Sequence, residues 1–175
     1  MKRFFWACLA IVAVVVGRNL CGVVHEVGHA LATWAVGGQV YHMQPWIFLG
    51  RAHTQLSNMS DSKTAVVCLF GSLAANLLGV LAVLLVPWNR LSTGVAVALA
   101  LFLFPCIVES WAFALEVVMP NSSGDALEFV LRSGCDDLVV SFVGLMVLCG
   151  SLWLWVYRTR LPSRLKDLWL NPQYD

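Results

Sequence analysis

Long apolar runs separated by short polar stretches organise the chain. A helix needs about 20 residues, at roughly 1.5 Å of rise each, to cross a bilayer. Four runs are long enough, and they cover approximately residues 4–36, 64–86, 94–119 and 138–157. The pattern predicts an all-α membrane protein, built as a bundle of about four transmembrane helices.

The first run is longer than one membrane crossing requires. As a single helix it would measure about 50 Å, against a hydrocarbon core of about 30 Å. We therefore expect it to tilt, to protrude or to bend near Gly17-Arg18-Asn19. Its basic start and apolar body resemble a secretory signal, but no small-x-small cleavage site follows. We expect this run to be the first helix of the mature protein.

Two connections between the runs hold most of the polar residues. The first, residues 37–61, is rich in aromatic and β-branched side chains and is broken by Pro45 and Gly50. Such a composition predicts a short extended or β segment at the membrane surface. The second connection, residues 120–137, carries more acidic than basic residues.

Composition and charge support a multi-pass membrane protein. Hydrophobic residues make up 59% of the chain and charged residues 12%, so the surrounding bilayer is an expected partner. A net charge of +1 gives no electrostatic support for nucleic-acid binding. Of the eleven Lys and Arg residues, seven lie at the N-terminus, after the second run, or in the basic tail at residues 158–175. This bias predicts that both termini are cytoplasmic and that the tail lies along the inner interface.

The stretch HEVGH, from His25 to His29, places ionisable groups in the apolar first run. Residues i and i+4 share one helix face, about 6 Å apart along the axis, so the two imidazoles can bind one ion. Glu26 projects about 100° away from His25 and can act as a general base. This arrangement is typical of a zinc metalloprotease, with Zn²⁺ as its cofactor.

A catalytic zinc ion needs a third protein ligand and keeps an open position for water. The HEVGH stretch lies toward the external end of the first helix, and the connection between the third and fourth runs returns to that same side. Asp125 in this connection is therefore our first candidate, although it could instead cap a helix. Glu116 is the main rival, as a ligand or as a hydrogen-bonding partner of one. The remaining alternatives are Glu109, His42, His53, Asp136 and Asp137.

Three segments together resemble the site-2 protease family of intramembrane zinc metalloproteases. They are HEVGHA in the first run, GSLAANLL at residues 71–78 and NSSGDA at residues 121–126. The resemblance implies that His25, His29 and Asp125 bind zinc, that Glu26 is the catalytic base and that Asn76 contacts substrate. The chain looks closer to a compact, divergent branch of that family, which lacks appended regulatory domains, and Ala126 stands where the family usually has glycine after the aspartate.

GSLAANLL also has a purely structural interpretation. Gly71, Ala75 and Gly79 recur every four residues, a small-residue stripe that allows close helix packing. Asn76 could then satisfy a neighbouring helix and not a substrate.

The expected function is hydrolysis of peptide bonds in or next to membrane segments of substrate proteins. Residues 1–157 would form a single transmembrane catalytic domain. Because a helical substrate hides its carbonyls, it must be locally extended, and residues 40–49 could supply a strand that pairs with it. The alternatives are a metal-ion or proton transporter that uses the same polar cluster, and a catalytically silent scaffold.

Overall fold

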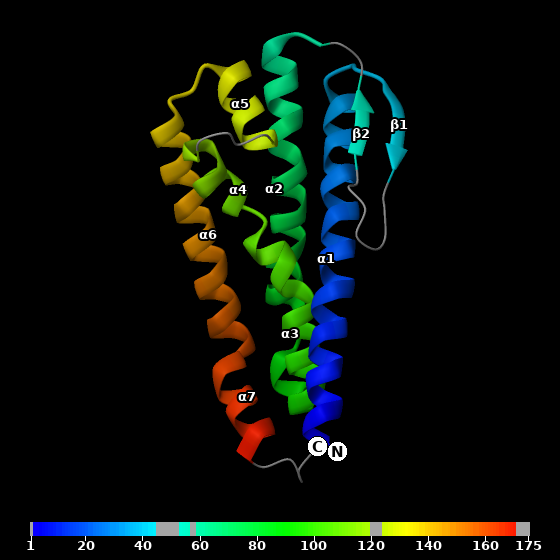
Figure 1. Ribbon diagram of the computed structural model, residues 1–175, viewed down its shortest axis with the longest axis vertical. Coiled ribbons are helices and arrows are strands. Elements are labelled where there is room, and N and C mark those ends of the chain that lie inside the picture. The colour runs from blue at the N-terminus through cyan, green and yellow to red at the C-terminus, as the bar shows by residue number, and fades with distance from the viewer. Residues whose placement is uncertain (1, 45–52, 57–58, 120–123, 171–175) are drawn as a thin grey trace.

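The structure, a computed structural model, describes residues 2–44, 53–56, 59–119 and 124–170. It is a helical bundle with a two-stranded hairpin beside one end (Figure 1). In chain order its elements are α1 (Lys2–Ala35), β1 (Val40–Gln44), β2 (His53–Leu56), α2 (Asp61–Leu85), η1 (Trp88–Arg90), α3 (Thr93–Val108), α4 (Trp111–Leu115), η2 (Glu116–Val118), α5 (Asp125–Ser133), α6 (Asp137–Thr159) and α7 (Leu161–Leu170).

Three of the described helices, α1, α2 and α6, are long and apolar enough to cross a membrane. Many of their large apolar side chains are exposed, among them Val12, Leu77 and Met146. Apolar surface of this extent is stable only where lipid covers it. The predicted all-α membrane bundle is confirmed. α1 runs for 34 residues without a break at Gly17-Arg18-Asn19.

The third apolar run is not one continuous helix. α3 ends at Val108, Glu109 and Ser110 form a turn, and the short helices α4 and η2 follow. A helix end leaves carbonyl oxygens without partners, which is costly in an apolar bundle. Here the side-chain amide of Asn76 on α2 donates to the carbonyl oxygens of Ile107, at 2.9 Å, and Cys106, at 3.4 Å. The break is stabilised by a residue from another helix, so the run's own hydropathy does not reveal it.

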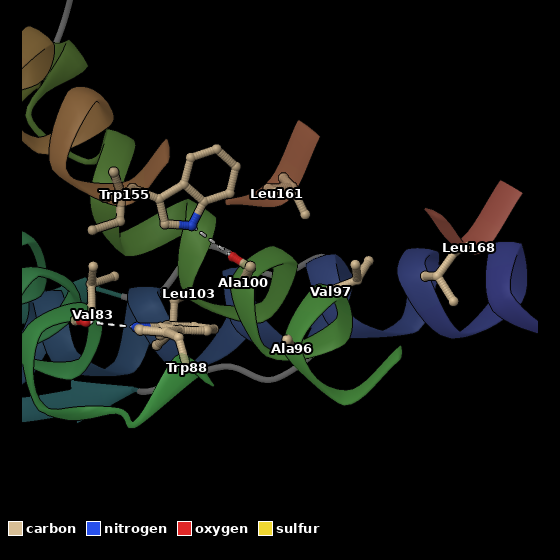
Figure 2. Close-up of a cluster of buried hydrophobic side chains, with 10 residues drawn as sticks. Val83, Trp88, Ala96, Val97, Ala100, Leu103, Trp155, Leu161 and Leu168 are labelled. Atoms are coloured by element: carbon tan, nitrogen blue, oxygen red, sulfur yellow. Dashed lines mark hydrogen bonds between the residues drawn. The ribbon is translucent and has the colours of Figure 1, made fainter. Parts of the chain in front are cut away.

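A hydrophobic cluster joins α2, α3, α6 and α7 near the end of the bundle where α1 begins (Figures 1 and 2). Figure 2 shows Trp88 and Trp155 in this cluster, each donating its indole N–H to a backbone carbonyl. Leu161 and Leu168 of α7 are buried in the same cluster. The first part of the basic tail is therefore an amphipathic helix packed on the bundle.

The hairpin and α5 lie at the opposite end from α7 (Figure 1). β1 and β2 pair in antiparallel fashion, with Gln44 opposite His53 and Val40 opposite Leu56. The extended or β segment predicted for this connection is present over the described residues. Residues 45–49, the second half of the predicted substrate-pairing strand, lie outside the described residues.

Candidate metal centre

The HEVGH stretch lies in the second half of α1, inside the bundle. Its spacing places His25 and His29 one above the other, with their Nε2 atoms 2.9 Å apart. His29 is buried, and the His25 side chain is 16% exposed. The i, i+4 geometry expected from the sequence is present, and both ring nitrogens point to one place.

Asp125 completes the group from a segment about a hundred residues later. Its Oδ2 lies 2.8 Å from Nε2 of His25 and 2.9 Å from Nε2 of His29. Asp125 is the first residue of α5, and Gly124 holds the N-cap position, so the carboxylate is not the helix cap. Among the described residues, these three are the one group of His, Cys, Asp and Glu whose ligand atoms come close enough to hold a metal ion together.

Packing at both ends of α5 fixes the position of Asp125. Ala126 is fully buried in a cluster with Phe113 and Val140. Farther along α5, Nη1 of Arg132 lies 2.6 Å from Oδ1 of Asp61, the first residue of α2. These contacts hold the short helix over α2 and leave its first residue beside α1.

The close contacts within the group call for a shared proton or a bound cation. Nδ1 of His29 lies 2.7 Å from the carbonyl oxygen of Val67, which can only accept, so Nδ1 carries the proton. In neutral His29, Nε2 is then a bare lone pair facing Asp125. When Nε2 of His25 and of His29 carries a proton instead, both rings donate to Asp125; burial alone would raise the pKa of Asp125, but these hydrogen bonds outweigh burial and lower that pKa below its ordinary value. A lone pair and a carboxylate held at 2.9 Å require a proton or metal ion beside them.

The donor set fits zinc. Two imidazole nitrogens and one carboxylate oxygen are typical ligands of a catalytic zinc site. Bonds of about 2.0–2.1 Å in tetrahedral geometry separate ligand atoms by roughly 3.3 Å. The observed separations of 2.8, 2.9 and 2.9 Å are a few tenths of an ångström shorter. Small outward movements of the three side chains would therefore accommodate the ion.

Gly71 on α2 forms the wall behind the imidazoles. A Cβ atom at this position would lie 2.5 Å from Nε2 of His29 and 2.8 Å from Nε2 of His25, closer than van der Waals contact permits. Gly28 of α1 makes a similarly close approach to the backbone of α2 at Phe70. Gly71 and Gly28 thus let α1 and α2 pack closely and leave room for the two imidazoles.

Glu26, the predicted base, is buried on α1, 7% exposed. Asn76, the predicted substrate contact, joins α2 to α3 and accepts a hydrogen bond from Ser151 of α6 at 3.3 Å. It also borders an apolar cavity of about 340 Å³ between α2, α4, α5 and α6. A role toward substrate remains a prediction for both residues.

Three of the alternative acidic residues are not among the converging side chains. Glu116 sits beside Gly124 and is not part of the three-residue group. Oδ1 of Asp136 caps α6 by accepting from the backbone N–H of Val139 at 3.1 Å. Oδ1 of Asp137 accepts from the N–H of Leu138 at 2.8 Å.

The remaining candidates are Glu109 and two histidines. Glu109 contacts the far side of the His25 ring, with Oε1 2.9 Å from Nδ1, and so lies behind one of the three converging residues and not among them. His42 is exposed on β1. The side chain of His53 lies outside the described residues.

No family model, curated protein or solved structure matches the chain. Two features of the site were absent from the sequence prediction: the contact of Gly71 with both imidazoles and the place of Glu109 behind His25. The small-residue stripe contained Gly71, but nothing in the stripe indicates what it faces.

Proposed function

We propose that the protein is an intramembrane zinc metalloprotease similar to the site-2 protease family. The observation that carries this proposal is the convergence of Nε2 of His25, Nε2 of His29 and Oδ2 of Asp125 within 2.9 Å, inside an apolar bundle. Ionisable groups are costly in such surroundings and are usually functional. HExxH is the arrangement that zinc proteases use for two ligands and a base.

In this proposal His25, His29 and Asp125 hold the ion. Zinc, when bound, supplies the Lewis acidity that peptide hydrolysis requires. Glu26 accepts a proton from the attacking water and passes it to the nitrogen of the leaving amine, while the carbon–nitrogen bond breaks. The buried position of Glu26 keeps its carboxylate away from bulk water.

The proposed substrate is a membrane protein whose scissile segment is locally extended. β1 and β2 form a two-stranded sheet in the described part of the chain, so each strand offers one edge to a further strand. An extended substrate could hydrogen-bond along such an edge. The hairpin contacts α1 and lies at the same end of the bundle as α5, so its edge would lie at the membrane face nearer the site.

A transporter is the second candidate, because the contacts of the site continue along α1 to Arg18, whose Nη1 lies 3.5 Å from Oε2 of Glu109. This path ends there. Between Arg3 and Arg18 the first helix holds no charged residue, and neither α3 nor residues 64–85 of α2 contain one. These segments therefore offer no charged group that could continue a proton or ion path.

Metal content of the purified protein tests the ligand set. We expect stoichiometric zinc in the wild type and in Glu116→Ala, and loss of zinc in His25→Ala and Asp125→Ala. Full zinc in Asp125→Ala together with its loss in Glu116→Ala would move the third ligand to Glu116. A wild type prepared with zinc present that retains none would contradict the proposal.

Cleavage of a reconstituted membrane substrate tests the reaction. Glu26→Gln should keep its zinc and lose about 10²–10⁴-fold in cleavage rate, since it removes only the general base. The same vesicles report transport. A flux of zinc or protons that persists in Glu26→Gln, with no cleavage by the wild type, would favour the transporter.

A further inference from the structure

Glu109 is a buried carboxylate at the turn between α3 and α4, and it reaches across to α1. Its Oε1 lies 2.9 Å from Nδ1 of His25. Its Oε2 accepts from the thiol of Cys21 at 3.3 Å and lies 3.5 Å from Nη1 of Arg18. The His25 ring thus lies between two carboxylates, Asp125 at Nε2 and Glu109 at Nδ1.

The two ring nitrogens of a neutral histidine have opposite roles. Metal binding through Nε2 requires the ring proton to be on Nδ1, and an acceptor beside Nδ1 favours that tautomer and fixes the ring. Nδ1 of His25 is buried and makes no hydrogen bond of standard geometry in the structure, although Oε1 of Glu109 is within reach. A small ring rotation would direct this N–H at the carboxylate.

We infer that Glu109 is a positioning residue, which holds the proton of His25 on Nδ1 and thereby frees Nε2 for the metal. This inference rests on the proposed zinc site. Without Glu109, the stronger acceptor near the ring is Asp125, and the proton would shift to Nε2, where it blocks the ion. His29 has the corresponding partner in the carbonyl oxygen of Val67, at 2.7 Å.

The Glu109 carboxylate could have a different role, which is to neutralise Arg18. An arginine halfway along an apolar helix needs a counter-charge. The contacts differ in closeness and burial. Arg18 is 63% exposed at its side chain and 3.5 Å from Glu109, whereas the His25 side chain is 16% exposed and 2.9 Å away. Glu109 therefore makes its closer and more buried contact with the histidine.

Zinc affinity separates the two explanations. In a competition titration with a chelating dye, Glu109→Gln should bind zinc about 10–100-fold more weakly than the wild type. The double variant Arg18→Gln/Glu109→Gln carries neither charge, and we expect its affinity to stay as low. Recovery to the wild-type value in the double variant, or an unchanged affinity in Glu109→Gln, would overturn the inference. Glu116→Gln is the matched carboxylate control and should bind zinc like the wild type.

A second measurement needs neither zinc nor activity. The chain has four histidines, so ¹⁵N-histidine labelling of the metal-free protein gives few signals, and His25→Asn identifies those of His25. At a pH high enough for His25 to be neutral, we expect its proton on Nδ1 in the wild type and a shift toward Nε2–H in Glu109→Gln. Glu109→Asp keeps the negative charge but shortens the side chain by one methylene group. We expect it to shift the ring proton of His25 toward Nε2 as well. A wild-type His25 protonated at Nε2 alone overturns the inference, whereas a wild type that binds no zinc overturns the proposed function.

Discussion

Gly71 shows how a single hydrogen atom in place of a side chain makes room for the site. Its missing Cβ would lie 2.5 Å from His29 and 2.8 Å from His25 at their Nε2 atoms. We predict that Gly71→Ala loses most of the proposed zinc and cleavage activity, because the added methyl group would displace the two imidazole nitrogens proposed to bind the metal. The zinc content and cleavage rate of purified protein measure this directly.

Gly22 offers a control for the same chemical change. It lies in α1 just before the HEVGH stretch, and a Cβ there would meet nothing within 4 Å. Gly22→Ala should therefore keep zinc and activity. Equal zinc in Gly71→Ala and Gly22→Ala would show that the imidazoles do not occupy the observed positions.

Some site residues could be predicted individually, and others depended on contacts between distant segments. His25 and His29 follow from helical periodicity alone, since four residues make about one turn. Asp125 follows from topology, because its connection returns to the end of the bundle that holds HEVGH. Glu109 was only one of several acidic alternatives. Its position behind His25 depends on where α3 ends, a tertiary feature that no local pattern specifies.

At the scale of elements, the end of α3 depends on Asn76. Its amide donates to two α3 carbonyls, and buried acceptors that lose their donor cost about 1–3 kcal/mol each. We predict that Asn76→Leu lowers the free energy of unfolding by a similar amount, as measured by chemical denaturation in detergent micelles. An unchanged stability with a raised KM would instead support the role of Asn76 as a substrate contact.

Ser151→Ala should destabilise the protein less than Asn76→Leu. It removes one hydrogen bond, from the Ser151 hydroxyl to Oδ1 of Asn76 at 3.3 Å, and leaves the amide donors in place. We expect a loss of about 0.5–1.5 kcal/mol in the same unfolding measurement. A larger loss than in Asn76→Leu would place the main stabilising contact on α6 and not on α3.

The break after α3 explains why some helices could be predicted from the sequence more accurately than others. α1, α2 and α6 are bounded by polar or turn residues that hydropathy detects, and their observed ends lie within three residues of the predicted ones. The run at residues 94–119 stays apolar through its break, and of its two charged residues Glu109 marks the turn. Hydropathy reports how much a segment avoids water but not whether its backbone hydrogen bonds continue.

At the scale of the whole molecule, the arrangement of the elements relates the position of the site to the two membrane faces. α1 begins, and α7 packs, at one end of the bundle, whereas the hairpin and α5 lie at the other (Figure 1). The candidate metal centre is nearer the second end, since it joins the later half of α1 to the first residue of α5. Any substrate would thus meet the site from the leaflet next to the hairpin.

The distribution of basic residues predicts which end faces the cytoplasm. Lys2, Arg3, Arg90 and the arginines of the tail belong to the end where α1 begins, and basic residues favour the cytoplasmic side. We predict that a reporter active only in the cytoplasm works when fused at either terminus and fails when inserted after Gly38. A reporter active only outside should give the reverse pattern. If the cytoplasmic reporter were inactive at both termini and active after Gly38, the bundle would have the opposite orientation. The candidate metal centre would then lie nearer the cytoplasmic leaflet.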